Sequence, residues 1–430
     1  MPVEPAGAVL EHHSVAVRDG AIERVFPPTE AKDFSHYEQL ELPDHVLIPG
    51  LVNAHTHAAM SLMRGLSDDL PLMRWLQEHI WPAETKHVSP RFVRDGTALA
   101  CAEMLRGGIT CFNDMYFFPE AALEAALEAG MRAALGLIVV DFPTAYASDP
   151  PDYLRKGLAL RDQQSEQPLV SFCLAPHAPY TVSDPTFRQI ATLAAELDLP
   201  VHLHVHETES EIERSLAEHG VRPLERLRRL GLVDANLIAV HSVHLDEEEI
   251  QLLARHGCSV AHCPSSNLKL ASGFSPIERL RRAGVNICLG TDGAASNNRL
   301  DLLAEMRTAA LLAKAVARDA EAMPAHAALR AATLGGARAL GLGQRIGSIE
   351  AGKRADLVAV ALRGPELTPC YDPVSHLVYA AGREHVTHVW VDGELRVGDG
   401  ELRNRHGFAP NGLDSRWRLW QNALESHADS

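Results

Sequence analysis

The segment PGLVNAHTHA, residues 49–58, ends an apolar run with two histidines, His55 and His57. The residues HVLIPGLVNA, 45–54, are typical of a buried strand, and side chains two residues apart on a strand point to the same face. Both imidazoles would therefore reach one point in space, as the first two ligands of a divalent metal must. An isolated H-x-H pair also occurs as two surface or hydrogen-bonded histidines. The metal interpretation therefore depends on whether the rest of the chain supplies further ligand candidates.

Short apolar strand candidates alternate with amphipathic helix patterns from about residue 46 to residue 343. This alternation predicts an α/β fold, a (β/α)8 TIM barrel, in which the active site lies at the C-terminal ends of the strands. An open doubly wound sheet is the alternative, but no glycine-rich nucleotide fingerprint follows an early strand. The eight strand candidates are residues 45–54, 108–114, 132–141, 169–176, 199–207, 236–241, 258–263 and 285–292.

Both ends of the chain differ from the barrel pattern. Residues 9–28 and 346–400 contain short alternating runs and Asp-Gly turns of the hairpin kind. They predict one small β-sandwich domain that is assembled from both chain ends, and the last stretch, SRWRLWQNALESHADS, predicts a terminal helix with a frayed tail. The predicted limits are 1–48 and 344–404 for the β-sandwich, 49–343 for the barrel, and 405–430 for the C-terminal helix and tail.

Composition excludes several classes of protein. The formal net charge is -16, so nucleic acid and anionic membranes are not expected as partners, because both require a basic face. No apolar run is long enough to span a bilayer, and the start MPVEPAGAVL lacks the features of a signal peptide, which favours a cytoplasmic location. The 7 cysteines are scattered without a C-x-x-C pair, as expected for reduced core residues.

Histidines and acids recur at the ends of other predicted strands. In VHLHVHE, residues 201–207, His202, His204 and His206 share one face of the strand, and at least one of them is a candidate third metal ligand. A single histidine at a strand end is usually a hydrogen-bonded packing residue, but convergence of several on one barrel face indicates a site. The further candidates at this face are His177, His241 and Asp292.

Taken together, the motifs that hold these residues resemble those of the amidohydrolase superfamily. Within it, the chain is similar to the 5'-methylthioadenosine/S-adenosylhomocysteine deaminases and their triazine chlorohydrolase relatives. The resemblance implies a barrel of the metal-dependent hydrolase type. The matching motifs run from residue 49 to residue 358: PGLVNAHTH, RGLSDDLPLMRWLQEHIWPAE, APHAPYTVS, HLHVHETESE, AVHSVHL, CPSSNLKLASG, LGTDGAASNN and GSIEAGKRADLV.

The resemblance implies that His55, His57, His204 and Asp292 bind one divalent metal, most simply zinc. Such a set leaves room for a water, whose pKa the metal lowers to about 7. A two-metal site would need a bridging lysine near the end of the fourth strand, and LVSFCLAPHAPY, residues 169–180, contains no lysine. Iron and manganese also suit three histidines and an aspartate, so the metal stays open between them and zinc.

Three residues carry the catalytic roles that the resemblance implies. Glu207 would be the general acid/base that takes a proton from the metal-bound water and delivers it to the purine N1 as hydroxide attacks C6. His241 would hydrogen-bond the attacking water, and Asp292 would ligate the metal and help to move protons. The alternative for Glu207 is an acid at the start of a helix, since ETESEIE also reads as an N-terminal helical turn.

The insert after the first strand, residues 64–84, gives the main indication of which substrate the chain binds. By resemblance, Glu84 would bind the two ribose hydroxyls, for which a carboxylate supplies two acceptors, and His177 would contact the purine. Trp75 and Trp81 would offer apolar surface to the purine or a thioether, although aromatic residues in an amphipathic insert are often core residues. Some members of the family that the chain resembles carry an arginine in the loop after the third strand that fits a charged homocysteine tail. This chain has none there before Arg155, which favours methylthioadenosine.

The resulting expectation is a zinc-dependent deaminase that converts 5'-methylthioadenosine to its inosine analogue and ammonia, with S-adenosylhomocysteine or adenosine as other substrates. The alternative keeps the metal but acts on a free purine or pterin base or a chlorotriazine, which has no diol for Glu84. A catalytically silent barrel paralogue would have lost ligands, and none is missing. The expected partner is a small nucleoside, and soluble enzymes of this kind are commonly homo-oligomers.

Overall fold

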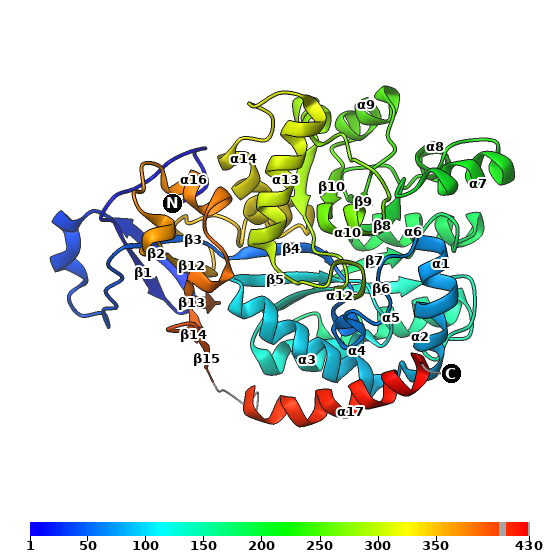
Figure 1. Cartoon of the computed structure of the whole chain (residues 1–430), viewed down its shortest axis with the longest axis horizontal. Helices are drawn as coiled ribbons and strands as arrows, with labels where there is room; N and C mark the ends of the chain where they lie inside the picture. The colour runs from blue at the N-terminus through cyan, green and yellow to red at the C-terminus, as the bar shows by residue number, and fades with distance from the viewer. Residues whose placement is uncertain (404–409, 429–430) are drawn as a thin grey trace.

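A computed structural model describes residues 1–403 and 410–428 of the chain. Eight parallel strands form one sheet in sequential order, with each strand hydrogen-bonded to the next along the chain, and helices surround it (Figure 1). This arrangement confirms the predicted barrel. Its strands are β4 (Leu51–Thr56), β5 (Ile109–Asp114), β6 (Arg132–Val139), β7 (Val170–Pro176), β8 (Val201–Val205), β9 (Leu237–His241), β10 (Ser259–His262) and β11 (Asn286–Leu289).

The first and last strands of this sheet meet at their C-terminal ends. The Asn53 side chain accepts a hydrogen bond from the backbone N–H of Thr291 at 3.0 Å and donates to its hydroxyl at 2.7 Å. One residue further on, the Asp292 N–H donates to the His55 carbonyl at 3.0 Å. These bonds close the barrel beside the predicted site and place Asp292 next to His55.

The strands are buried because helices cover the outside of the barrel while side chains fill the inside, as parallel sheets require. Polar caps begin several of the covering helices; for example, Asp246 and Glu249 form a reciprocal capping box at α9. The longer helices are α3 (Pro90–Arg106), α4 (Pro119–Ala129), α5 (Pro150–Gln164), α6 (Asp184–Leu197), α7 (Glu209–His219), α9 (Glu247–His256) and α13 (Leu302–Ala317).

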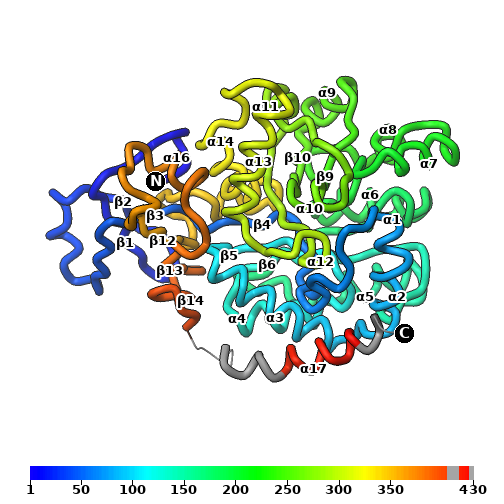
Figure 2. The backbone as a smooth tube through the Cα atoms, viewed as in Figure 1, coloured from blue at the N-terminus to red at the C-terminus, as the bar shows by residue number. Residues whose placement is uncertain are grey.

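Shorter helices and turns complete the barrel, and their path is easiest to follow as a tube (Figure 2). They include 3-10 turns at η2 (Ala58–Met63) and π-helical turns at η3 (Leu76–Ile80) and η4 (Ala331–Gly335). The short α-helices are α1 (Leu72–Trp75), α2 (Trp81–His87), α8 (Pro223–Arg229), α10 (Pro264–Lys269), α11 (Ile277–Arg282), α12 (Ala294–Asn297), α14 (Ala325–Arg330), α15 (Gly336–Ala339) and α16 (Pro373–Tyr379).

A second, antiparallel sheet is built from both ends of the chain, as predicted. Its five strands are hydrogen-bonded in the order β15-β14-β13-β12-β3, and a separate hairpin, β1-β2, turns at Asp19-Gly20. Both turn residues have positive φ, 51° and 74°, which the Asp-Gly pair tolerates. The strands are β1 (Ser14–Arg18), β2 (Ala21–Phe26), β3 (His45–Pro49), β12 (Leu357–Ala361), β13 (Val386–Val391), β14 (Glu394–Gly398) and β15 (Glu401–Leu402).

The segment 45–54, which the sequence suggests as one strand, is two strands in different sheets. β3 pairs with β12 in the antiparallel sheet, and β4 enters the barrel after Gly50. A Cβ at Gly50 would lie 2.0 Å from the Thr110 hydroxyl, so only glycine allows the chain to pass here. The domain limits inferred from the sequence stay predictions.

A buried ion-pair group links the barrel to the antiparallel sheet. Arg132 at the start of β6 is 2% exposed and binds Asp356 at 2.8 Å and Asp392 at 3.1 Å. Both acids flank strands of the antiparallel sheet, Asp356 before β12 and Asp392 after β13. Because an unpaired charge is costly when buried, these contacts hold the sheet against the barrel end opposite the predicted site.

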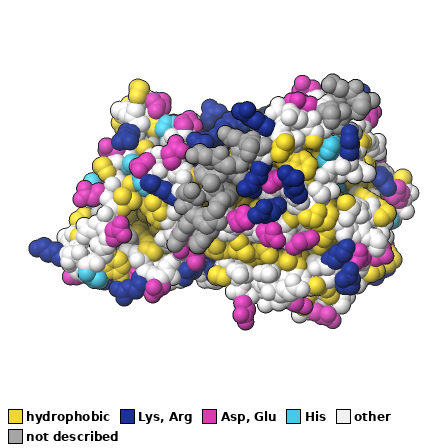
Figure 3. All heavy atoms as spheres, turned by 90° about the horizontal axis from the view of Figure 1, so that it is seen from below, with side chains coloured by type: hydrophobic (Ala, Val, Ile, Leu, Met, Phe, Trp, Pro, Cys, Tyr) yellow, Lys and Arg dark blue, Asp and Glu magenta, His cyan; other side chains and the backbone are white. Residues whose placement is uncertain are grey.

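Of the predicted C-terminal segment 405–430, residues 405–409 and 429–430 lie outside the described residues, and the rest forms helix α17 (Pro410–Ala428). Trp420 anchors α17 on α3, because its indole N–H donates to Asp95 at 3.0 Å and its ring meets Phe92 edge to face. Seen from below, the surface carries Lys, Arg, Asp and Glu side chains interspersed with apolar ones (Figure 3). Across the described residues, no helix combines the length and apolar character that a membrane span requires.

Candidate metal centre and active site

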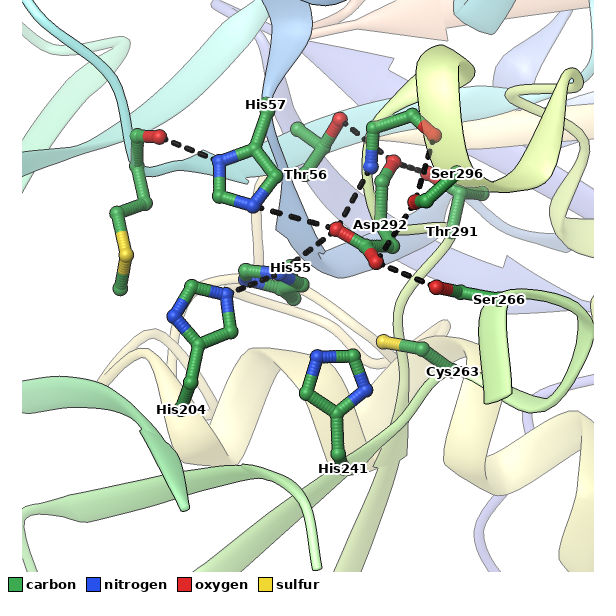
Figure 4. Close-up of polar contacts among 12 residues, drawn as sticks. His55, Thr56, His57, His204, His241, Cys263, Ser266, Thr291, Asp292 and Ser296 are labelled. Atoms are coloured by element: carbon green, nitrogen blue, oxygen red, sulfur yellow. Dashed lines mark hydrogen bonds and ion pairs between the residues drawn. The ribbon is translucent and has the colours of Figure 1, made fainter. Parts of the chain in front are cut away.

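Four predicted ligands meet at the C-terminal ends of three barrel strands. His55 and His57 come from the end of β4, His204 from β8, and Asp292 from the turn after β11. One nitrogen or oxygen atom of each lies within 4.8 Å of those of the others, and the side chains point toward one another (Figure 4). His55, His204 and Asp292 are buried and His57 is half-buried, so the cluster is largely removed from water.

The three histidine rings all turn the same nitrogen toward the cluster. The Nδ1 of His57 donates to the Met115 carbonyl at 2.6 Å, and that of His204 donates to the His177 carbonyl at 2.7 Å. At His55, Nδ1 lies 2.8 Å from the Nε2 of His202. Each Nε2 is therefore free to face a common point, which is the arrangement expected of metal-binding imidazoles.

Asp292 presents one carboxylate oxygen to the histidines and has the other held by hydroxyl groups. Its Oδ1 lies 3.2 Å from the Nε2 atoms of both His55 and His57. Its Oδ2 accepts hydrogen bonds from the hydroxyls of Ser266 at 2.6 Å and Ser296 at 2.8 Å. The carboxylate is thus oriented before any ligand binds. Sequence reasoning missed both serines, although Ser266 lies in the quoted motif CPSSNLKLASG.

Burial and charge set the protonation of the cluster. Burial lowers the pKa of His55 to about 4 and that of His204 well below its usual range, which keeps both rings neutral. Burial disfavours a charged His57, but the hydrogen bond to Asp292 prevails and raises its pKa to about 9. Burial would raise the pKa of Asp292, yet His55 and His57 hold it well below its usual range. A divalent cation bound here would displace the His57 proton, and the resulting donor set, three imidazoles and one ionised carboxylate, fits such a cation.

Glu207 and His241 lie beside the cluster. Glu207 is 5% exposed, and its Oε2 lies 3.8 Å from the Nε2 of His241, whose Nδ1 donates to the Asn267 side chain at 2.8 Å. Burial raises the pKa of Glu207, so this carboxyl group can hold a proton more easily than one in water. Helix α7 begins at Glu209 with Thr208 as its cap, which places Glu207 before the helix.

A cavity of about 610 Å³ opens from this cluster. Its lining includes the predicted metal and catalytic residues apart from His55, which is fully buried. The other predicted residues lie along its walls, and the described lining contains no Lys or Arg. The predicted residues that line the cavity are His57, Trp75, Trp81, Glu84, His177, His204, Glu207, His241 and Asp292.

The insert that was singled out in the sequence covers the cavity with α1, the π-helical turn η3 and α2. Trp75 is 5% exposed and belongs both to the hydrophobic core and to the cavity wall, so the two interpretations of this residue hold together. Trp81 is half-buried in the same wall. His177, at the end of β7, lines the same cavity, and its ring centroid lies 4.9 Å from that of His204.

Glu84 is held by a tyrosine that sequence reasoning missed. The hydroxyl of Tyr116, which follows β5, donates to Glu84 Oε1 at 2.7 Å. Burial raises the pKa of Glu84 to about 6, and the Tyr116 hydrogen bond opposes that rise. The only sequence signal for Tyr116 is its place two residues after the end of a barrel strand, where site residues gather.

Comparisons with known proteins agree with this geometry. The model of the amidohydrolase family matches residues 46–396. The 5-methylthioadenosine/S-adenosylhomocysteine deaminase of Saccharophagus degradans is 50% identical over 431 residues, covering 100% of this chain and 96% of its own length. The crystal structure of an adenosine deaminase from Xanthomonas campestris with bound zinc has a TM-score of 0.96 and 52% identity, covering 99% of this chain and 97% of its own.

A more distant structure shares the fold alone. Atrazine chlorohydrolase from Arthrobacter aurescens, complexed with zinc, has a TM-score of 0.88 and 24% identity, with 96% of each chain covered. The matched family model, the high identity over the full length and the cluster at the barrel mouth lead to one conclusion. This chain belongs to the amidohydrolase family.

Proposed function

We propose that this chain is a zinc-dependent deaminase of 5'-thio-substituted adenosines, with 5'-methylthioadenosine as its preferred substrate. The observation that carries the proposal is one cavity lined by two chemically distinct groups of residues. The cluster of three histidines and Asp292 lies there with Glu207, and the Glu84 carboxylate lies in the apolar wall formed by the insert. The relative from Saccharophagus degradans, at 50% identity, carries the name of such a deaminase.

The reaction replaces the exocyclic amino group of the purine with oxygen from water and releases ammonia. A zinc ion held by His55, His57, His204 and Asp292 would lower the pKa of a water to about 7 and act as a Lewis acid. Glu207 takes a proton from the attacking water and delivers it to the purine N1, for which its raised pKa suits it.

Other residues of the chain orient the reactants. His241, whose Nδ1 donates to Asn267, forms a hydrogen bond with the attacking water through its Nε2 and so orients that water. Asp292, besides holding the metal, takes the second proton from the oxygen added at C6 and passes it to the amino group, which leaves as ammonia while the C6–O bond becomes a carbonyl. His177 contacts the purine ring, and Glu84 accepts hydrogen bonds from the two ribose hydroxyls.

The apolar wall accounts for the proposed preference. Trp75 and Trp81 pack against the purine or the thioether, and Phe142 lines the cavity after β6. The methylthio group is neutral, whereas the tail of S-adenosylhomocysteine carries a carboxylate and an ammonium group. Because the described lining offers no cation to that carboxylate, burying the tail would cost more than burying a methyl group.

The test is a substrate panel with zinc-loaded protein: methylthioadenosine, S-adenosylhomocysteine, adenosine, adenine, guanine and a chlorotriazine, followed by ammonia release and ultraviolet change. We expect methylthioadenosine to give the highest kcat/KM. Glu207→Gln should lower kcat about 10²- to 10⁴-fold with its zinc content unchanged. Glu209→Gln, at a neighbouring acid that is 83% exposed, should act like the wild type.

The alternative, a hydrolase of free purine or pterin bases or of chlorotriazines, predicts a different outcome of the same panel. Strong turnover of a free base or the triazine with inert nucleosides would keep the metal chemistry and overturn the role of Glu84. Inactivity on every compound would overturn the proposed reaction.

We also propose, from the sequence, that the protein is a homo-oligomer in the cytoplasm with no nucleic-acid partner. Light scattering after size-exclusion chromatography tests the first part, since a monomer of 46.8 kDa would contradict it. Cell fractionation tests the second.

A further inference from the structure

One of the three histidines in the cluster is supported by a side chain and the other two by the backbone. The Nδ1 atoms of His57 and His204 bond to the carbonyl oxygens of Met115 and His177, which no substitution removes. The Nδ1 of His55 lies 2.8 Å from the Nε2 of His202. The two rings cross at 72° with their centroids 4.8 Å apart, and both residues are 0% exposed.

The position of His202 follows from strand alternation. His202 precedes His204 by two residues on β8, so both side chains point into the barrel. His202 therefore lies one layer below the cluster, directly behind His55. Its Nδ1 atom is buried and has no hydrogen-bond partner among the described residues. The contact to His55 is thus the polar interaction that its ring makes in this structure.

The hydrogen positions of this pair follow from the chemistry of neutral imidazole. If the Nε2 of His55 presents a lone pair to a cation, its Nδ1 must carry the hydrogen. That N–H can only donate to the Nε2 of His202, which must then be unprotonated. Because a neutral imidazole has a single N–H, the hydrogen of His202 lies on its Nδ1.

We propose that His202 is a positioning residue of the metal centre, whose Nε2 accepts the Nδ1–H of His55 and so fixes the ring orientation and tautomer that present Nε2 to the cation. The inference rests on the proposed zinc site. Partners of this kind change metal affinity about 10- to 100-fold when they are removed. His202 does not touch the cavity, so its effect would pass entirely through His55.

The first experiment measures zinc affinity of the metal-free protein in competition with a chromophoric chelator. His202→Leu keeps an apolar group of similar size but removes the acceptor, and we expect it to weaken zinc binding about 10- to 100-fold. His202→Gln offers an amide oxygen near the position of Nε2 and should restore affinity to within a few-fold of the wild type. A packing role alone would make the two variants alike, and that result would overturn the proposal.

His262 provides a matched control. It is a buried histidine on β10 whose Nδ1 also has no partner, and it forms no hydrogen bond with the four cluster residues in the described structure. His262→Leu should leave zinc affinity unchanged. A loss equal to that of His202→Leu would show that affinity follows core packing in general, which would also overturn the proposal.

A second measurement does not depend on the folding of His202→Leu. Long-range ¹H–¹⁵N correlation spectra of wild-type protein labelled at histidine report the tautomer of each ring, and His202→Gln assigns the His202 signals. We expect a neutral His202 protonated on Nδ1 and a hydrogen on His55 Nδ1. A His202 ring protonated on Nε2 would overturn the proposal. Wild-type protein that binds no zinc would instead overturn the proposed function, while the spectra still decide the pairing of His202.

Discussion

The cavity lining has two parts that are built in opposite ways: the metal cluster with its neighbours, here the metal end, and the wall formed by the insert and the loop after β6, here the insert wall. At the metal end, each ligand side chain is held by a second contact; Asp292, for example, is fixed by the hydroxyls of Ser266 and Ser296. In the insert wall the surfaces are apolar, and Glu84 with its Tyr116 partner supplies the directed polar contact. In the proposed reaction, the chemistry therefore depends on side chains at strand ends that are each fixed by a second contact, whereas selection of the substrate depends on loop and insert segments that can change without disturbing them.

The largest effect is expected from the substitution of a proposed ligand at the metal end. Asp292→Ala removes a ligand and the acceptor of the Ser266 hydroxyl, while the Ser296 hydroxyl keeps a hydrogen bond to the Gly293 carbonyl. We expect loss of bound zinc and a fall in kcat/KM of about a thousandfold or more, since the other ligands cannot replace the ionised carboxylate. Metal analysis and steady-state kinetics measure both.

Asp95→Asn is the control for this substitution. Asp95 is also a buried acid, but it lies on α3 and accepts from Trp420 of the C-terminal helix. This variant should keep its zinc and its kcat even if it unfolds at lower temperature. Full zinc content in Asp292→Ala, or more than a tenth of the wild-type activity, would contradict the assignment of the ligand.

A smaller effect is expected from the substitution of Glu84, the polar group of the insert wall. Glu84→Gln removes the charged acceptor proposed for the ribose hydroxyls, and hydrogen bonds to charged groups are worth about 10- to 100-fold in kcat/KM. The loss should appear with nucleosides and be absent from whatever activity the enzyme has on adenine, which has no diol. Glu78→Gln is the control, since Glu78 lies in the same insert with its side chain 53% exposed and paired to Arg74. Equal losses with methylthioadenosine and adenine would contradict the role of Glu84.

Much of the metal end could be predicted from the sequence because it depends on local rules. Side chains alternate along a strand, which pairs His55 with His57, and strand ends of a barrel meet at one face, which brings His204 and Asp292 to them. The strand positions were predicted for the same reason, since buried parallel strands read as short apolar runs between amphipathic helices.

Features that depend on packing between distant segments were not predictable in this way. Gly50 moves the chain from one sheet to another because Thr110, 60 residues later, leaves no room for a side chain. Tyr116 contacts Glu84, and Ser266 contacts Asp292, because the closed barrel brings these distant segments together. Their residue types occur in many loops and carry no spacing that links them to their partners, so only tertiary structure identifies them.

Tyr116→Phe tests how much the insert wall depends on the hydrogen bond from Tyr116 to Glu84. It removes the hydrogen bond that holds Glu84, and we expect KM for methylthioadenosine to rise about 3- to 10-fold near neutral pH with kcat nearly unchanged. Burial raises the pKa of Glu84 to about 6, and the Tyr116 bond opposes that rise. In the wild type, KM should therefore increase as the pH falls through about 6, because protonation removes the charge of the acceptor. In the variant this increase should begin at higher pH, and an unshifted profile would contradict the coupling.

The smallest effect concerns selection between thio-substituted nucleosides. Phe142 lines the cavity after β6 and is 43% exposed, so an arginine there can reach the tail of a substrate while its charge stays hydrated. Because partly exposed ion pairs contribute about 1 kcal/mol or less, Phe142→Arg should raise the ratio of kcat/KM for S-adenosylhomocysteine over methylthioadenosine only about 3- to 5-fold. Phe142→Gln removes the same ring without adding charge, and its ratio should stay near that of the wild type. The gain in Phe142→Arg should also shrink at high salt, since a screened charge attracts less. If the two variants shift the ratio equally at all salt concentrations, the wall selects by shape, and the missing cation is not what disfavours the charged tail.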